Sequence, residues 1–161
     1  MEEQKKKMKI TDPALALVKA EAWCALQERC QQEVRDKLYG WGLWPDAVEN
    51  IIAELISRNF LDEERFAKAY AGGKFRQKHW GRVKIKLELK KRKVSDYCIR
   101  KGLAEIDGKD YLATLRKLAA EKSRTIKEKH YLKKKYKIMT YLAGKGYEQD
   151  LVREIMCGDE D

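Results

Sequence analysis

The chain has 161 residues, 39% of them charged, with 36 Lys or Arg against 26 Asp or Glu and a net charge of +10. It can bury a core, but so much charge with only two prolines argues against a compact α/β enzyme and favours a thin helical protein. No run of eighteen apolar residues is present, so we expect a soluble, cytoplasmic protein without a membrane span. Residues 1–10 have no apolar signal core and are expected to form a short flexible tail.

The first helix is predicted to begin at Pro13. Asp12 can accept hydrogen bonds from the first turn, and proline at the first helical position loses no hydrogen bond. The apolar positions of this helix are Leu15, Val18, Ala22, Cys24, Ala25 and Leu26. A second helix begins near Gln31 and stops at residues 40–42, and Pro45 opens a third. Trp41 and Trp44 flank the turn between them and are expected to pack over the core.

A further helix is predicted to begin at Asp62, which has the position of an N-cap. Leu61 and Phe66 have the spacing of a hydrophobic staple, so both are expected to be structural. The apolar side chains expected on one face of this helix are Phe66, Ala69, Tyr70 and Phe75.

Residues 83–90 alternate apolar and polar side chains, which taken alone is typical of an amphipathic strand. We favour a helix, because the corresponding segments elsewhere in the chain do not alternate. Lys, Leu and Glu are also good helix formers.

A pattern of about fifty residues occurs three times. It consists of two apolar residues one turn apart, a turn, and a staple pair. The apolar pairs are Val34 and Leu38, Ile85 and Leu89, and Ile138 and Leu142; the turns follow at Gly42, Lys93 and Gly146; the staples are Leu43 with Val48, Val94 with Ile99, and Tyr147 with Val152. Asp107 repeats the helix start of Asp62. The sequence therefore predicts an all-α fold of three tandem three-helix repeats in an elongated, curved molecule. The first unit is 11–58, the second 59–106 and the third 107–157, followed by an acidic tail, 158–161.

The excess positive charge is concentrated in residues 74–101, which we call the basic window. It holds twelve Lys or Arg and two acids, whereas the rest of the chain holds 24 of each sign. Such a field predicts a polyanionic or acidic partner, and the interleaved rings are typical of nucleic-acid or protein-groove binding. The alternative is a solvated helix face without a partner. The candidate contact residues are Lys74, Arg76, Lys78, His79, Trp80, Arg82, Lys84, Lys86, Lys90 and Lys91. Arg82, Lys86 and Lys90 are expected to share a solvent-exposed helix face. A second basic run, 127–137, is either a solvated extension of a linker or a second contact patch.

No motif of an enzyme is present: there is no Gly-rich phosphate loop, no H-E-x-x-H and no G-x-S-x-G. Asp62, Glu63 and Glu64 are acidic because they begin a helix, where negative charge complements the helix dipole. The four cysteines and two histidines lack metal-ligand spacing, so neither a metal nor a cofactor is expected.

Three segments occur in the order that characterises one known family. They are the run FLDEERFAKAY at 60–70, the triplet KFR at 74–76 and the run WGRVKIKLELK at 80–90. In these segments the chain resembles the RecX regulatory proteins, modulators of the RecA recombinase. It differs from the family pattern at Lys93, where a glycine is usual, and at Gly72 and Gly73, which lie within a helix that the family usually keeps regular.

The resemblance implies a monomeric, non-catalytic protein of DNA repair, recombination and the SOS response. It would bind the RecA filament on single-stranded DNA and inhibit its ATPase, strand exchange and filament extension. The alternatives are a stand-alone DNA or RNA chaperone that uses the same basic surface, and a helical scaffold for another acidic protein. Inhibition of the recombinase ATPase below the concentration that saturates DNA separates the first hypothesis from the other two.

Overall fold

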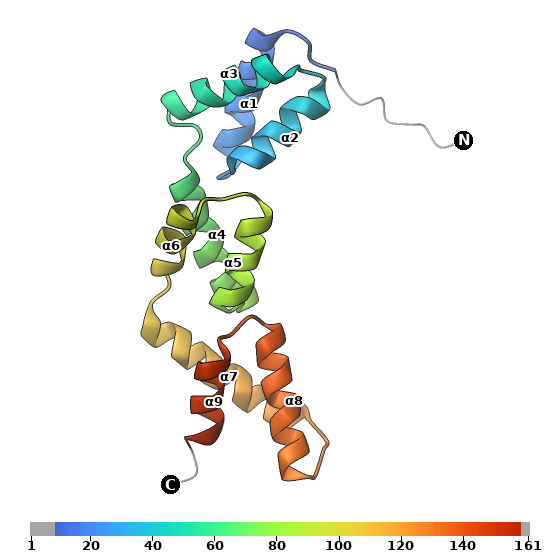
Figure 1. Cartoon of the computed structure of the whole chain (residues 1–161), viewed down its shortest axis with the longest axis vertical. Coiled ribbons are helices and arrows are strands. Elements are labelled where there is room, and N and C mark those ends of the chain that lie inside the picture. The colour runs from blue at the N-terminus through green and yellow to red at the C-terminus, as the bar shows by residue number, and fades with distance from the viewer. Residues whose placement is uncertain (1–8, 159–161) are drawn as a thin grey trace, which may run out of the picture.

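The computed structural model describes residues 9–158, which form a gently curved column of helices with no strand in that range (Figure 1). In chain order the helices are α1 (Pro13–Leu26), α2 (Gln31–Trp41), α3 (Pro45–Ser57), α4 (Glu63–Lys78), α5 (Arg82–Lys91), α6 (Asp96–Ala104), α7 (Gly108–Thr125), α8 (Tyr131–Gly144) and α9 (Gln149–Cys157). They stack as three successive triplets, so the predicted all-α repeat fold is confirmed. We propose the boundaries 11–58, 59–106 and 107–157 for the three units.

The helices that open the three units begin at capping aspartates. The side chains of Asp12, Asp62 and Asp107 accept hydrogen bonds from the backbone N–H groups of Ala14, Arg65 and Asp110, each at 3.0 Å. These bonds satisfy N–H groups that have no partner inside the helix.

The repeated apolar pattern forms the core of each triplet. The paired residues of α2, α5 and α8 are all buried, as are the six staple residues. The turns after these helices share one conformation: Gly42 and Gly146 have φ of 100° and 97°, and Lys93 has φ of 58°. Lys93 thus adopts the left-handed turn that glycine adopts in the other two units.

The alternating segment 83–90 is helical, as predicted, and lies in α5. Ile85 and Leu89 face the core, whereas Val83 and Leu87 are about half exposed. The alternation therefore reflects apolar residues on both faces of a helix.

Helix α1 buries a different face from the one that its large apolar residues suggested. Its buried residues are Ala16, Ala20 and Cys24, and the exposed face carries Leu15, Val18, Ala22, Ala25 and Leu26. Small side chains allow α1 to lie close to its neighbours, which leaves the larger ones outside. Two smaller expectations also fail, because Trp44 is half exposed and Ala69 is exposed on α4.

The buried side chains form two clusters. One fills the first unit and includes Leu61, and the other runs without a break through the second and third units and includes Cys30. Leu61 and Phe66 are both buried, as their staple spacing predicted. The predicted tails lie outside the described residues except at Lys9, Ile10 and Gly158. Ile10 is buried, and its N–H donates to the carbonyl of Trp41 at 2.9 Å, so the prediction of a flexible tail over 1–10 is wrong at this residue.

Candidate nucleic-acid interface

Trp80 is the centre of the basic window. It lies in the α4–α5 loop, partly packed on the core, with the Lys74 and Lys84 ammonium groups 5.1 and 4.5 Å from its ring centroid. Lys74 also lies 5.4 Å from the ring of Tyr70. These are cation–π distances. The structure thus brings together the Trp80 ring and two of the predicted lysines, one from each flanking helix.

Arg82 does not point freely to solvent, contrary to the expected shared face. Its guanidinium lies 3.9 Å from the Tyr111 ring centroid and donates to Glu148 Oε2 at 2.9 Å. Its backbone N–H donates to the Tyr111 hydroxyl at 3.0 Å, and that hydroxyl donates to Glu148 Oε1. Arg82 therefore joins the second unit to the third, and its charge is largely offset by Glu148.

The loop before Arg82 makes similar junction contacts through its backbone. The Lys78 carbonyl accepts from Lys145 Nζ, and the His79 carbonyl accepts from the Tyr147 hydroxyl, both at 2.8 Å. The side chains of Lys78 and His79 remain exposed, as does that of Arg76. These three side chains stay available to a partner while the main chain below them is fixed.

Helix α5 divides its basic residues between two flanks. At 100° per residue, Lys86 and Lys90 fall on one side of the buried Ile85–Leu89 line, and Lys84 and Lys91 fall on the other. Lys86 and Lys90 are exposed, whereas Lys91 contacts Glu88 at 3.1 Å. The ten candidate residues therefore do not form a single flat patch.

The second basic run occupies the α7–α8 loop and the first half of α8, at the lower end of Figure 1. It carries large exposed side chains that were not among the contact residues predicted from the sequence: Tyr131, Leu132 and Tyr136. Their signal was present in the sequence, because Tyr131 and Tyr136 flank lysines as Phe75 and Trp80 do in the basic window.

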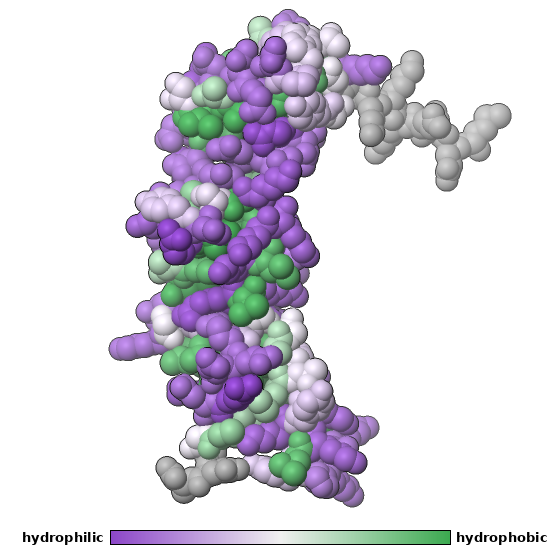
Figure 2. Space-filling model, in the orientation of Figure 1, coloured by the Kyte–Doolittle hydropathy of each residue, from purple (hydrophilic) through white to green (hydrophobic). Residues whose placement is uncertain are grey.

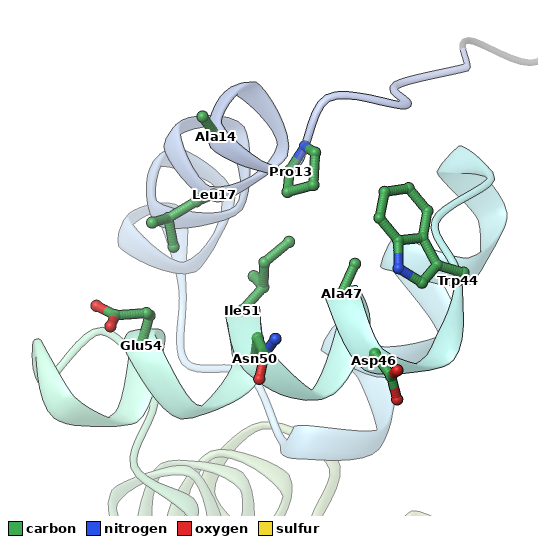
Figure 3. Close-up of a pocket in the computed structure, with 9 residues that line it drawn as sticks. All are labelled: Pro13, Ala14, Leu17, Trp44, Asp46, Ala47, Asn50, Ile51 and Glu54. Atoms are coloured by element: carbon green, nitrogen blue, oxygen red, sulfur yellow. The ribbon is translucent and has the colours of Figure 1, made fainter.

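The first unit has a different surface. Residues 11–58 hold five Lys or Arg and eight Asp or Glu, giving a net charge of −3. Between α1 and α3 lies a groove of about 310 Å³, lined by Pro13, Ala14, Leu17, Trp44, Asp46, Ala47, Asn50, Ile51 and Glu54 (Figure 3). In Figure 3 the Trp44 ring forms one end of the groove, and the carboxylates of Asp46 and Glu54 lie along its α3 edge. Figure 2 shows apolar patches interrupting an otherwise hydrophilic face of the column.

Two of the four thiols, those of Cys24 and Cys30, are buried. Burial raises the pKa of Cys24, and it raises that of Cys30 to about 11, so both stay protonated at neutral pH. Among residues 9–158 no group of three or more His, Cys, Asp or Glu side chains could hold a metal ion. Within the same range no helix is long and apolar enough to cross a membrane.

Fold and surface together define a helical-repeat protein with a basic, ring-bearing flank. Family models of RecX match two parts of the chain: the second three-helix domain matches residues 62–103 and the third matches 109–156. The chain belongs to the RecX family.

Two named RecX proteins are similar to this chain in sequence. The chain is 33% identical over 130 residues to the regulatory protein RecX of Clostridium perfringens, and 27% identical over 149 residues to that of Prosthecochloris aestuarii. These alignments cover 80% and 92% of this chain. The chain spans 60% of the length of the first relative and 96% of the second.

The fold also matches a solved structure. The crystal structure of RecX from Lactobacillus salivarius superimposes with a TM-score of 0.82 at 24% identity, over 91% of this chain and 95% of that one. At this identity the likeness concerns the fold.

Proposed function

We propose that this protein is a non-catalytic regulator that binds the RecA recombinase filament on single-stranded DNA and inhibits its ATPase, strand exchange and extension. The observation that carries the proposal is the Trp80 surface, in a chain of the RecX family. There Lys74 and Lys84 flank an aromatic ring, with exposed Arg76, Lys78, Lys86 and Lys90 on the same two helices. A basic, ring-bearing surface suits a filament that carries DNA.

The charge of the separate units supports a mixed partner of protein and nucleic acid. The second unit holds 14 basic and 6 acidic residues and the third holds 13 and 7, whereas the first is net acidic. The first unit combines an apolar groove with a net negative charge, so it is poorly suited to bind phosphates and better suited to bind a protein. A nucleoprotein filament presents protein and nucleic acid side by side.

The alternative is a stand-alone DNA or RNA chaperone that uses the same basic surface. That function accounts for the second and third units. It gives no role to the acidic first unit with its exposed Trp44 and α1 face, and for this reason we place it second.

The test is the double charge reversal Lys86→Glu and Lys90→Glu, which leaves Arg82 and its junction contacts intact. Both lysines are exposed, so stability should change by less than about 1 kcal/mol. If both contact phosphates, the salt slope of single-strand binding should fall by about two. Inhibition of the RecA ATPase should weaken in parallel.

The matched control is Lys109→Glu with Lys117→Glu, which reverses two exposed lysines of the α7 region outside both basic runs. It should bind and inhibit like the wild type. A folded Lys86/Lys90 variant that binds and inhibits as well as the wild type would remove the Lys86–Lys90 flank of α5 from the mechanism. Wild-type protein that binds single strands but leaves the recombinase ATPase unchanged would favour the chaperone.

A further inference from the structure

Tyr136 is the most exposed tyrosine among residues 9–158. It lies on α8, 71% of its surface is accessible, and no hydrogen bond or ring contact holds it among residues 9–158. Exposing an aromatic ring of this size to water is unfavourable, since rings ordinarily bury most of their area. Its position suits a ligand that can cover a flat apolar face.

Tyr136 and Thr140, one turn apart, separate two hollows that we call the α9-side and α7-side hollows. The α9-side hollow, about 280 Å³, is also lined by Met139, Ala143, Gln149, Val152 and Arg153. The α7-side hollow, about 370 Å³, is also lined by Lys122, Ile126, Lys137 and Tyr141. The ring therefore stands on a ridge with a hollow on each side.

Cations surround this ridge. Arg153 borders one hollow, and Lys122 and Lys137 border the other. Residues 122–137 hold eight Lys or Arg and one acid, Glu128, which contacts Lys137 Nζ at 3.5 Å. The Lys122 ammonium lies 4.6 Å from the Tyr141 ring centroid, so a cation and a second ring meet in the α7-side hollow.

We propose that the Tyr136 ridge is a binding site for single-stranded nucleic acid, in which a base stacks on the Tyr136 ring and the strand crosses α8 from Arg153 towards Lys122 and Lys137. Stacking on an exposed ring flanked by cations is the usual way in which proteins hold single strands without reading their sequence. The inference rests on the proposed function for the identity of the strand, and it adds a second contact at the far end of the column from the first unit.

The chemistry favours a single strand over a duplex and over a protein. A duplex keeps its base faces stacked inside, so it offers phosphates but no flat face to Tyr136. A protein partner would need an apolar side chain to cover the Tyr136 ring and acidic side chains to pair with the surrounding cations. The net charge of residues 107–157, with 13 basic and 7 acidic residues, and the isolated ring together fit a chain of phosphates and bases.

The test is Tyr136→Ala, compared with Tyr136→Phe, in binding of the full-length protein to a labelled oligothymidylate across a salt series. Loss of one stacked base should weaken binding about 5- to 150-fold, and Phe should restore it because the ring is kept. The salt slope should stay the same in Tyr136→Ala, since stacking displaces no counterion, and should fall by about one in Lys133→Gln if that exposed lysine contacts a phosphate.

The control is Tyr39→Ala, which removes a 41% exposed tyrosine from the acidic first unit and should change nothing. Duplex binding should be unaffected in Tyr136→Ala and Tyr136→Phe, because a duplex offers no free base face to the ring. Tyr136→Ala with wild-type single-strand affinity would overturn the inference, and if it also lost inhibition of the recombinase the ridge would be a protein contact. If the Lys86/Lys90 variant loses inhibition and Tyr136→Ala behaves like the wild type, the proposed function stands and the Tyr136 site is rejected. If the wild-type protein does not inhibit the recombinase but Tyr136→Ala still loses single-strand binding, the Tyr136 site stands and the proposed function is rejected.

Discussion

Arg82, Tyr111 and Glu148 form a hydrogen-bonded set of side chains at the junction of the second and third units. The Tyr111 ring is buried beneath the Arg82 guanidinium, and its hydroxyl both accepts from the Arg82 backbone and donates to Glu148. Burial, followed by the hydrogen bond to the Glu148 carboxylate, raises the pKa of Tyr111 well above its usual value near 10. Burial likewise raises the pKa of Tyr147 in the adjoining turn.

These shifts predict a loss of stability in alkali. Above about pH 10 the tyrosines ionise in the unfolded chain, while the folded protein keeps Tyr111 neutral. The free energy of unfolding should therefore be at its full value below that pH and fall as the pH rises towards the higher folded pKa. Urea unfolding at a series of pH values from neutral to strongly alkaline measures this slope.

Tyr111→Phe should make the alkaline slope shallower and lower stability at pH 7 by about 1–3 kcal/mol, because the Arg82 N–H and Glu148 lose a buried partner. Tyr136→Phe, at an exposed position, should keep the wild-type slope. Cys30, whose pKa is about 11, acts in the same direction and is present in every variant compared. Equal slopes in the two variants would contradict the role given to Tyr111.

For single residues, the sequence predicts burial better than it predicts which charged side chains are free to contact a partner. Leu61 and Phe66 were identified because a staple has a fixed spacing. The contacts of Arg82 with Tyr111 and Glu148 could not be predicted, because these partners lie in α7 and at the start of α9, 29 and 66 residues away. Side-chain pairing over such separations depends on how units stack, which local spacing does not encode.

Among the elements, the α4–α5 loop and the α8–α9 turn pack directly against each other. The Gly81 N–H donates to the Lys145 carbonyl at 2.8 Å, and the Val83 N–H donates to the Gly146 carbonyl at 2.9 Å. A Cβ on Gly81 would lie 2.2 Å from the Gly146 oxygen, and one on Gly146 would lie 2.3 Å from the Lys84 Cβ. Both glycines are thus required by close approach of two backbones.

Gly81→Ala should therefore open this junction and lower the free energy of unfolding by about 1–3 kcal/mol or more, as overpacking does. Gly144→Ala is the control, because nothing lies within 4 Å of its Cβ position at the last residue of α8. That change should raise stability by about 0.5–1 kcal/mol through helix propensity. Urea midpoints of the two variants should move in opposite directions, and a Gly81→Ala midpoint at or above that of the wild type would disprove the close packing.

Element by element, the sequence predicted helices well where one face is clearly apolar. It was misleading for α1, whose apolar residues surround the helix and so do not indicate which side is buried. The buried line turned out to be Ala16, Ala20 and Cys24, which are all small side chains. For α5 the period-two alternation was outweighed by comparison with the other units and by the helix propensity of Lys, Leu and Glu.

For the whole molecule, the two buried clusters divide the column unequally. The second and third units share one continuous core and the backbone contacts at Gly81, whereas the first unit has a core of its own. The first and second units are joined by Leu61 and Cys30 and by the ion pairs Arg65–Glu28 at 2.5 Å and Arg92–Glu33 at 3.5 Å. The paired side chains are about a third exposed, so each pair contributes only about 0–1 kcal/mol.

This division predicts how damage spreads through the column. Leu115→Ala, in the shared core, and Leu55→Ala, in the core of the first unit, each remove a fully buried leucine and should cost about 2–5 kcal/mol. Amide hydrogen exchange should then quicken throughout the second and third units in Leu115→Ala, but only in the first unit in Leu55→Ala, because partial unfolding follows cooperative blocks of packing. Since the acidic first unit and the basic remainder carry different surfaces, a joint that opens independently would let each adapt to its own part of the filament that we propose as the partner. Equal quickening along the whole chain in both variants would mean instead that the three units unfold as one body, and the column would then have to meet its partner as a rigid rod.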